Sequence, residues 1–225
     1  MSKTNAELAT LRTSLLAKLM PEHLRWVNVS VGVNVTDVGC FEVFVEVCLP
    51  VVIDDFFLPV TAKETFQIAK KFNALPLTRA IADEFFNQSE HIPPQPLDPN
   101  KDILNFEKYS TYLLPRYGDG KSNKKASGAH KLWLLSGQGT SINYGFYVKR
   151  GKDASQGGKT LSKDFTVIQS LGGRHNQEHW DYSQLLQIMR ATKPLLLNNK
   201  SLTLPEAINE GLPGVWDESK KVTVE

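Results

Sequence analysis

The feature that most constrains the fold is a run of alternating residues near the start of the chain. Residues 27–36 read Val-Asn-Val-Ser-Val-Gly-Val-Asn-Val-Thr, with a valine at every second position. Successive side chains of a strand point to opposite faces, so the run predicts a strand with one apolar face. After a turn at 37–39, apolar residues alternate again from Phe41 to Val47. Two strands so close in sequence are expected to pair as an antiparallel hairpin.

Helices are predicted on either side of this hairpin. Leucines at helical spacing predict an amphipathic helix over residues 5–20. The sequence Thr61-Ala-Lys-Glu64 is a capping box, which predicts a helix from there to about Asn73. A further helix is expected from Thr78 to Gln88. We expect the last two to form a helical hairpin that covers one face of a sheet.

The second half of the chain returns to strands. Apolar patterns predict strands at 130–135, 143–149 and 165–170, a helix at 182–190 and a helical turn at 204–209. Because strands and helices do not alternate regularly, the prediction is an α+β fold with a largely antiparallel sheet. We expect a single domain over residues 1–225. If it is divided, the proline-rich linker at 91–100 would join lobes at 1–90 and 101–225.

Composition excludes several classes of protein. The 225 residues are 41% hydrophobic, and no apolar run approaches the roughly 20 residues of a membrane-spanning helix. The polar, periodic N-terminus does not resemble a secretory signal, so a cytoplasmic protein without membrane contact is expected. The two cysteines, Cys40 and Cys48, form no CxxC pair and are interpreted as small buried hydrophobic residues.

Charge is unevenly distributed along the chain. The formal net charge is +2, yet residues 116–163 hold ten basic residues against two acidic ones. That segment carries +8 and the rest of the chain −6. A basic stretch can attract an anionic polymer or a phosphate group, although its lysines can equally be solvated loop residues. Nucleic acid is not the expected partner, because no RNA-binding aromatic signature is present.

Residues 172–184, Gly-Gly-Arg-His-Asn-Gln-Glu-His-Trp-Asp-Tyr-Ser-Gln, form the densest cluster of reactive side chains. The cluster follows a predicted strand, at the kind of connection where functional groups concentrate. Common motifs such as a phosphate-binding glycine loop, HExxH and GxSxG are absent from the chain.

Two kinds of hydrolytic chemistry fit the cluster. His175 can act as a general base toward Ser183 or a water molecule, with Asp181 orienting its ring. Alternatively, His175, His179 and Asp181 can bind a divalent metal such as zinc that activates water. A purely structural interpretation remains open, because Asp181 and Gln184 have the spacing of a capping box.

Substrate binding is assigned to residues in and near the same segment. Lys131 would hold an anionic group or a developing oxyanion. His130, Arg174 and Tyr182 are the other candidate substrate-binding residues. The leading hypothesis is a hydrolase of an anionic peptide or glycan such as cell-wall material. The alternatives are a non-catalytic module that binds an anionic polymer, and a structural or virion component.

Several short motifs resemble a group of uncharacterised bacterial proteins. The resemblance covers about residues 50–220, and its first half rests on the segments Asp54-Asp-Phe-Phe-Leu-Pro-Val-Thr61, Ile68-Ala69, Leu75-Pro76 and Pro93-Pro-Gln-Pro96. Its second half rests on a His-Lys strand, a Tyr-Gly strand and a His…Asp-Tyr-Ser segment, matched here by His130-Lys131, Tyr144-Gly145, His175 and Asp181-Tyr182-Ser183. The group has a histidine after Asp-Tyr-Ser, where this chain has Gln184. The resemblance implies no activity, but it adds weight to His175, Asp181, Ser183 and Lys131.

Overall fold

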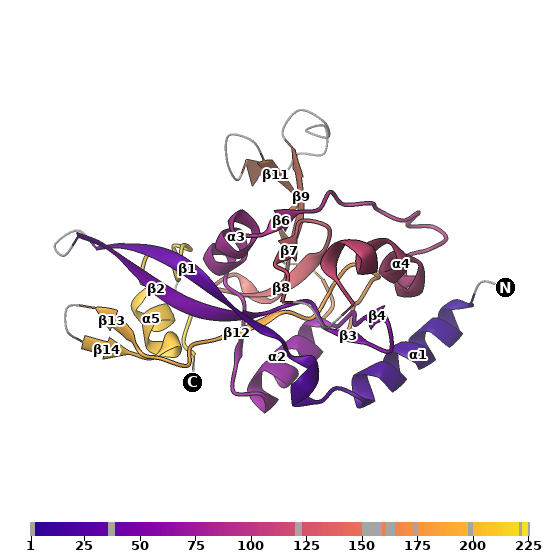
Figure 1. Ribbon diagram of the computed structural model, residues 1–225, viewed down its shortest axis with the longest axis horizontal. Helices are drawn as coiled ribbons and strands as arrows, with labels where there is room; N and C mark the ends of the chain where they lie inside the picture. The colour runs from indigo at the N-terminus through magenta and orange to yellow at the C-terminus, as the bar shows by residue number, and fades with distance from the viewer. Residues whose placement is uncertain are drawn as a thin grey trace.

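A computed structural model describes most of the chain (Figure 1). The described residues are 3–35, 39–119, 123–149, 159–160, 165–172, 175–197, 200–220 and 222–224. Within them, α-helices are combined with antiparallel sheets, which confirms the predicted α+β class. No helix in this part of the chain is long and apolar enough to cross a membrane.

The valine-rich hairpin forms one edge of a four-stranded sheet. Strand β1 (Trp26–Val35) pairs with β2 (Gly39–Cys48) in antiparallel register, from Trp26 opposite Cys48 to Val35 opposite Gly39. The hairpin prediction is therefore confirmed. The sheet continues from β2 to β12 (Ile188–Arg190) and then to β5 (Leu75–Pro76).

A second four-stranded sheet contains the strands predicted in the second half. Its order is β10 (Lys159–Thr160), β11 (Phe165–Gly172), β9 (Gly139–Lys149) and β8 (Lys131–Ser136), with every pairing antiparallel. Gly145 allows a close approach in this sheet. It has a φ of +135°, and a Cβ at that position would lie 2.5 Å from the backbone oxygen of His130.

The remaining elements surround these sheets. The helices are α1 (Asn5–Ala17), η1 (Pro21–His23), α2 (Ala62–Lys71), α3 (Arg79–Asn87), α4 (Phe106–Tyr117) and α5 (Leu204–Glu210). Three small pairs complete the described strands: β3 (Val52–Ile53) with β4 (Phe56–Phe57), β6 (Glu90–His91) with β7 (Ala126–Ser127), and β13 (Leu195–Leu197) with β14 (Lys200–Leu202). In Figure 1, α1 lies at one end of the molecule, and α5 with β13–β14 lies at the other.

The two helices expected to form a hairpin are separated by a strand. Helix α2 begins at the predicted capping box, in which Thr61 and Glu64 bond each other's backbone amides. Strand β5 lies between α2 and α3 and pairs with β12. The two helices also pack into different hydrophobic clusters. Ile68 of α2 belongs to the cluster that contains Trp133, and Phe85 of α3 belongs to the cluster that contains the valines of the hairpin.

The helix predicted at 182–190 is wrong. This segment is extended: Gln184 bridges Lys131, Leu185 bridges Pro59, and β12 pairs with both β2 and β5. The helical spacing of its apolar residues is therefore overridden by tertiary backbone pairing. The segment joins the two sheets, because Gln184 meets β8 of one sheet and β12 belongs to the other.

Strand β8 faces two different hydrophobic clusters. Leu132 and Leu134 pack in the cluster that holds the valine face of the hairpin. Trp133, on the opposite face, packs in the cluster that holds buried residues of α1, α2 and α4. Because side chains alternate along a strand, Lys131 shares the face of Trp133.

Candidate functional site

Three residues form a row across the second sheet on the face of Trp133. Asn143 of β9 is directly opposite Trp133 of β8 and also opposite Gly172 of β11. Residues directly opposite each other in an antiparallel ladder point to the same face. Trp133 and Asn143 are each only 1% exposed, so both side chains are enclosed.

His175 covers this row. Its ring centroid lies 5.8 Å from that of Trp133 in an edge-to-face contact. At the other end of the row, a Cβ on Gly172 would lie 3.9 Å from His175 Nε2. Asn143 is the middle residue of the row, between the two residues that the His175 ring approaches. The His179 ring stacks on His175, with centroids 5.5 Å apart and planes 16° apart.

Two buried carboxamides have polar atoms without a hydrogen-bond partner among the described residues. Neither Nδ2 nor Oδ1 of Asn143 has a hydrogen bond within the described residues, and the same is true of Gln184 Nε2. Gln184 is 0% exposed and bridges Lys131, which lies two residues before Trp133 on the same face. An unmade hydrogen bond at a buried amide costs about 1–3 kcal/mol, so such groups call for a ligand or water.

Lys131, Asp181 and Ser183 form a buried polar cluster. Lys131 Nζ forms an ion pair with Asp181 Oδ2, with side-chain exposures of 13% and 3%. The other carboxylate oxygen accepts hydrogen bonds from the amide and hydroxyl of Ser183, at 2.8 and 2.6 Å. Both oxygens of Asp181 are therefore engaged. The hydroxyl proton of Ser183 points to Asp181, and Ser183 is 0% exposed.

The surroundings of the His175 ring favour its neutral form. Partial burial lowers the pKa of His175, and the neighbouring His179 and Lys131 lower it further, whereas Asp181 acts in the opposite direction. A lowered pKa favours the uncharged imidazole. A neutral imidazole can accept a proton, as a general base must.

The segment that carries His175 is fixed against α2. Lys63 donates its backbone amide to Gln177 O, at 3.2 Å, and its ammonium group pairs with Glu178 at 2.7 Å. Arg12 of α1 lies over the Trp180 ring, 4.7 Å from its centroid, and donates from Nε to Pro59 O. The segment is therefore held by contacts with two helices, α1 and α2.

The other predicted substrate-binding residues lie in different surroundings. His130 is buried, with Nδ1 bonded to Tyr117 Oη at 2.8 Å and Nε2 to Gln187 Oε1 at 2.7 Å. Burial lowers the pKa of His130 to about 4. Tyr182 is also buried, and its hydroxyl accepts a hydrogen bond from Leu97 N at 2.9 Å. Arg174 lies outside the described residues.

The predicted metal ligands do not form a coordination set as they stand. The rings of His175 and His179 stack on each other, and both oxygens of Asp181 are engaged by Lys131 and Ser183. In the part of the chain that the structure describes, no three His, Cys, Asp or Glu side chains gather as metal ligands would.

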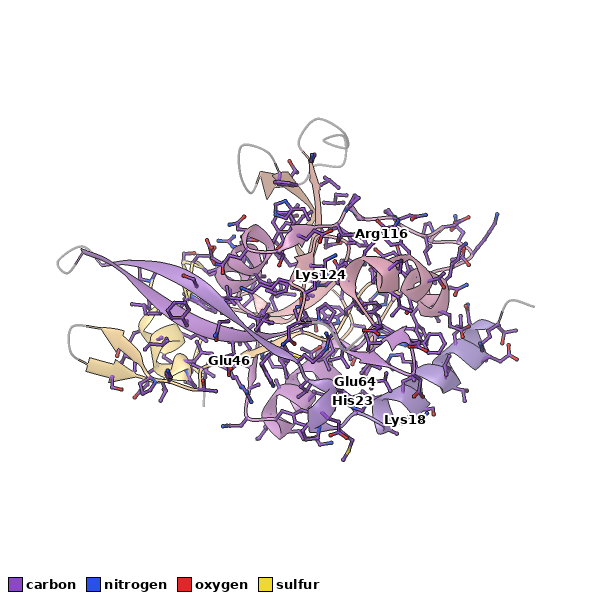
Figure 2. All side chains as sticks on the ribbon, in the orientation of Figure 1. Lys18, His23, Glu46, Glu64, Arg116 and Lys124 are labelled. Atoms are coloured by element: carbon purple, nitrogen blue, oxygen red, sulfur yellow. The ribbon has the colours of Figure 1, made fainter. Side chains whose placement is uncertain are left out.

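Part of the basic stretch is engaged by neighbouring side chains where it is described. Lys124 pairs with Glu90, Lys131 pairs with Asp181, and Arg116 stacks on Tyr112. Figure 2 shows Arg116 and Lys124 well away from Glu64. Glu64 lies in the first turn of α2, the helix that contacts the His175 segment. Lys121, Arg150, Lys152 and Lys163 lie outside the described residues.

Comparisons with known proteins give no relative. No family model matches the chain, and no curated protein or solved structure matches it.

The sequence interpretation missed Asn143 and the contribution of Trp133. Asn143 stands between Ile142 and Tyr144 in an otherwise apolar half-strand, and a carboxamide in such a place is a usable signal. Its closeness to His175 is not visible in the sequence, because the two residues are 32 positions apart.

Proposed function

We propose that the protein is a hydrolase of an anionic peptide or glycan, with water as the nucleophile. The observation that supports this most is the Asn143 carboxamide, which has no partner among the described residues and stands between the two residues that the exposed His175 ring approaches. A proton acceptor and free hydrogen-bonding groups then lie side by side, as hydrolysis of an amide requires.

In this proposal, His175 removes a proton from water as the water oxygen attacks an acyl carbon. The substrate is an amide bond in a peptide, or an acetamido group in a glycan. The Asn143 carboxamide is enclosed, so in this proposal it holds the attacking water by a hydrogen bond rather than contacting the substrate. The imidazolium then returns the proton to the leaving nitrogen, which restores neutral His175.

The Lys131 cluster supports water rather than serine as the nucleophile. Ser183 is enclosed and donates its proton to Asp181, which already pairs with Lys131. The Lys131 side chain is 13% exposed, and in this proposal its ammonium group, which pairs with Asp181, also contacts an anionic group of the substrate.

The test compares the wild-type protein with His175→Gln on peptidoglycan and on generic amide and ester substrates. Removal of a general base is expected to lower kcat by about 100-fold or more. His23→Gln is the matched control, because His23 lies in η1 and bonds only the nearby Met20 amide in the described structure. Equal activity of wild type and His175→Gln, or no activity in either protein, contradicts the proposal. Salt-sensitive polymer binding that His175→Gln leaves intact would instead support the binding-module alternative.

A further inference from the structure

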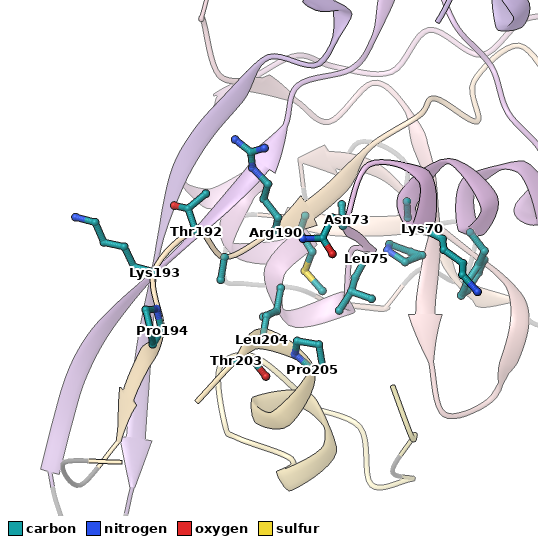
Figure 3. A pocket seen from close by; sticks show the side chains of 16 residues that line it. Lys70, Asn73, Leu75, Arg190, Thr192, Lys193, Pro194, Thr203, Leu204 and Pro205 are labelled. Atoms are coloured by element: carbon teal, nitrogen blue, oxygen red, sulfur yellow. The ribbon is translucent and has the colours of Figure 1, made fainter. Parts of the chain in front are cut away.

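A groove of about 880 Å³ lies between α2, β5, β12 and α5, apart from the His175 site (Figure 3). Leu75, Met189, Leu204 and Pro205 contribute apolar surface to it. Lys63, which contacts the His175 segment, and Lys70, which lines the groove, are seven residues apart on α2. They are thus separated by about 10 Å along the helix axis. The groove and the His175 segment therefore contact opposite ends of α2.

The charge of the groove has one sign. Its described lining includes Lys70, Arg190 and Lys193 but no acidic residue. Arg190 is neutralised by Glu46 and stacks on Trp26. Lys70 and Lys193 are exposed, and neither has an ion pair within the described residues. By contrast, seven other lysines do pair with carboxylates there: Lys3, Lys18, Lys63, Lys101, Lys108, Lys124 and Lys131.

We propose that this groove binds an amphiphilic anion, namely a molecule with an alkyl chain and a carboxylate head. The volume falls within the range of small-molecule sites, which combine an apolar lining with a few polar groups that fix orientation. Figure 3 shows Lys70 and Lys193 on opposite sides of the groove, with Leu75, Leu204 and Pro205 between them. The alkyl chain occupies this apolar centre, and the head lies at one of the two lysines.

For such a ligand, the binding affinity should depend on both the alkyl chain and the charged head. Burial of alkyl carbons favours binding by up to about fourfold per methylene, so decanoate should bind more tightly than hexanoate. Decanol has the same chain without the charge and should bind more weakly than decanoate. Each ligand is kept below the concentration at which it forms micelles.

The test is isothermal titration of the full chain with decanoate, hexanoate and decanol. The variant Lys70→Gln with Lys193→Gln is expected to weaken decanoate binding by about tenfold. The matched control is Lys71→Gln with Lys101→Gln, which removes the same charge from lysines outside the groove lining and should bind as the wild type does. The single variants Lys70→Gln and Lys193→Gln then show which end holds the head.

Three results would overturn the proposal. These are no saturable binding of decanoate, equal affinity for hexanoate and decanoate, and an unchanged affinity in the Lys70→Gln, Lys193→Gln variant. Light scattering tests whether a second copy of the chain, rather than a small molecule, occupies the groove. A dimer that dissociates in this variant would show that a second copy of the chain covers the groove, which also contradicts the proposal. The activity of His175 is not involved, so this test and that of the proposed function can fail separately.

Discussion

His130 and His175 are both close to strand β8, and their surroundings differ in one respect. Each ring nitrogen of His130 has a partner, and those partners are bonded in turn: Ala129 N donates to Tyr117 Oη, and Gln187 Nε2 donates to Cys48 O. His175 is exposed and approaches the two neighbours of Asn143, whose buried carboxamide has no partner among the described residues. Because an unmade buried hydrogen bond is costly, the first arrangement is explained by stability alone and the second is not.

The largest expected effect concerns the stability of the His130 network. His130→Leu leaves Tyr117 Oη and Gln187 Oε1 without their buried partner, and we expect a loss of about 3 kcal/mol in the free energy of unfolding. His175→Ala removes an exposed ring and is expected to change it by less than about 0.5 kcal/mol. Urea unfolding measures both. Comparable losses in the two variants would remove the distinction between the two histidines.

A second polar cluster, centred on Asp83, allows the stability of such groups to be compared at different pH values. Asp83 Oδ1 accepts hydrogen bonds from Tyr144 Oη at 2.7 Å and Tyr147 Oη at 3.1 Å. Burial raises the pKa of Asp83 from 3.8 to about 6, although the two tyrosine hydrogen bonds oppose the shift. The folded state therefore holds this proton more tightly than the unfolded state. Stability from this group is present below pH 3.8 and is lost as the pH rises through about 6.

Asp83→Asn tests this contribution, because an amide oxygen can still accept from the tyrosines. Between pH 4 and 7, the wild type should lose on the order of 2 kcal/mol relative to the variant. His130 acts in the opposite direction, since its lowered pKa stabilises the fold above pH 6.5 and this stability is lost as the pH falls through about 4. His130 is present in both proteins and cancels in the difference. Parallel urea-midpoint curves against pH would contradict the expectation.

The smallest expected change in stability is an increase rather than a loss. Asn143→Leu replaces a buried, unpartnered carboxamide by an apolar group of similar size, and it should stabilise the fold by about 1 kcal/mol. The same variant should lower any activity that depends on His175. The matched control is Gln187→Leu, which breaks bonds to His130 and Cys48 and should destabilise the protein. Destabilisation by Asn143→Leu would show that the carboxamide serves the fold.

Local patterns in the sequence predicted much of the secondary structure. The valine alternation gave the β1–β2 pairing, since burial of one face follows directly from a period of two. The Thr61–Glu64 box was sufficient to place the start of α2, because capping bonds join residues three apart. The Asp181–Gln184 spacing also produces a bond, from Asp181 N to Gln184 Oε1. There it closes a turn and no helix follows.

For the candidate site, the sequence determined the residue types and the cluster at 175–184. Which residues meet was decided by tertiary structure. Pairing of 184–190 with β8, Pro59, β2 and β5 replaced the expected helix, and it brought Asp181 to Lys131, 50 residues away. The sheet register set Asn143 between Trp133 and Gly172. The physical reason is that periodicity and capping are encoded within a few residues, whereas register and polar partnership depend on strands distant in sequence.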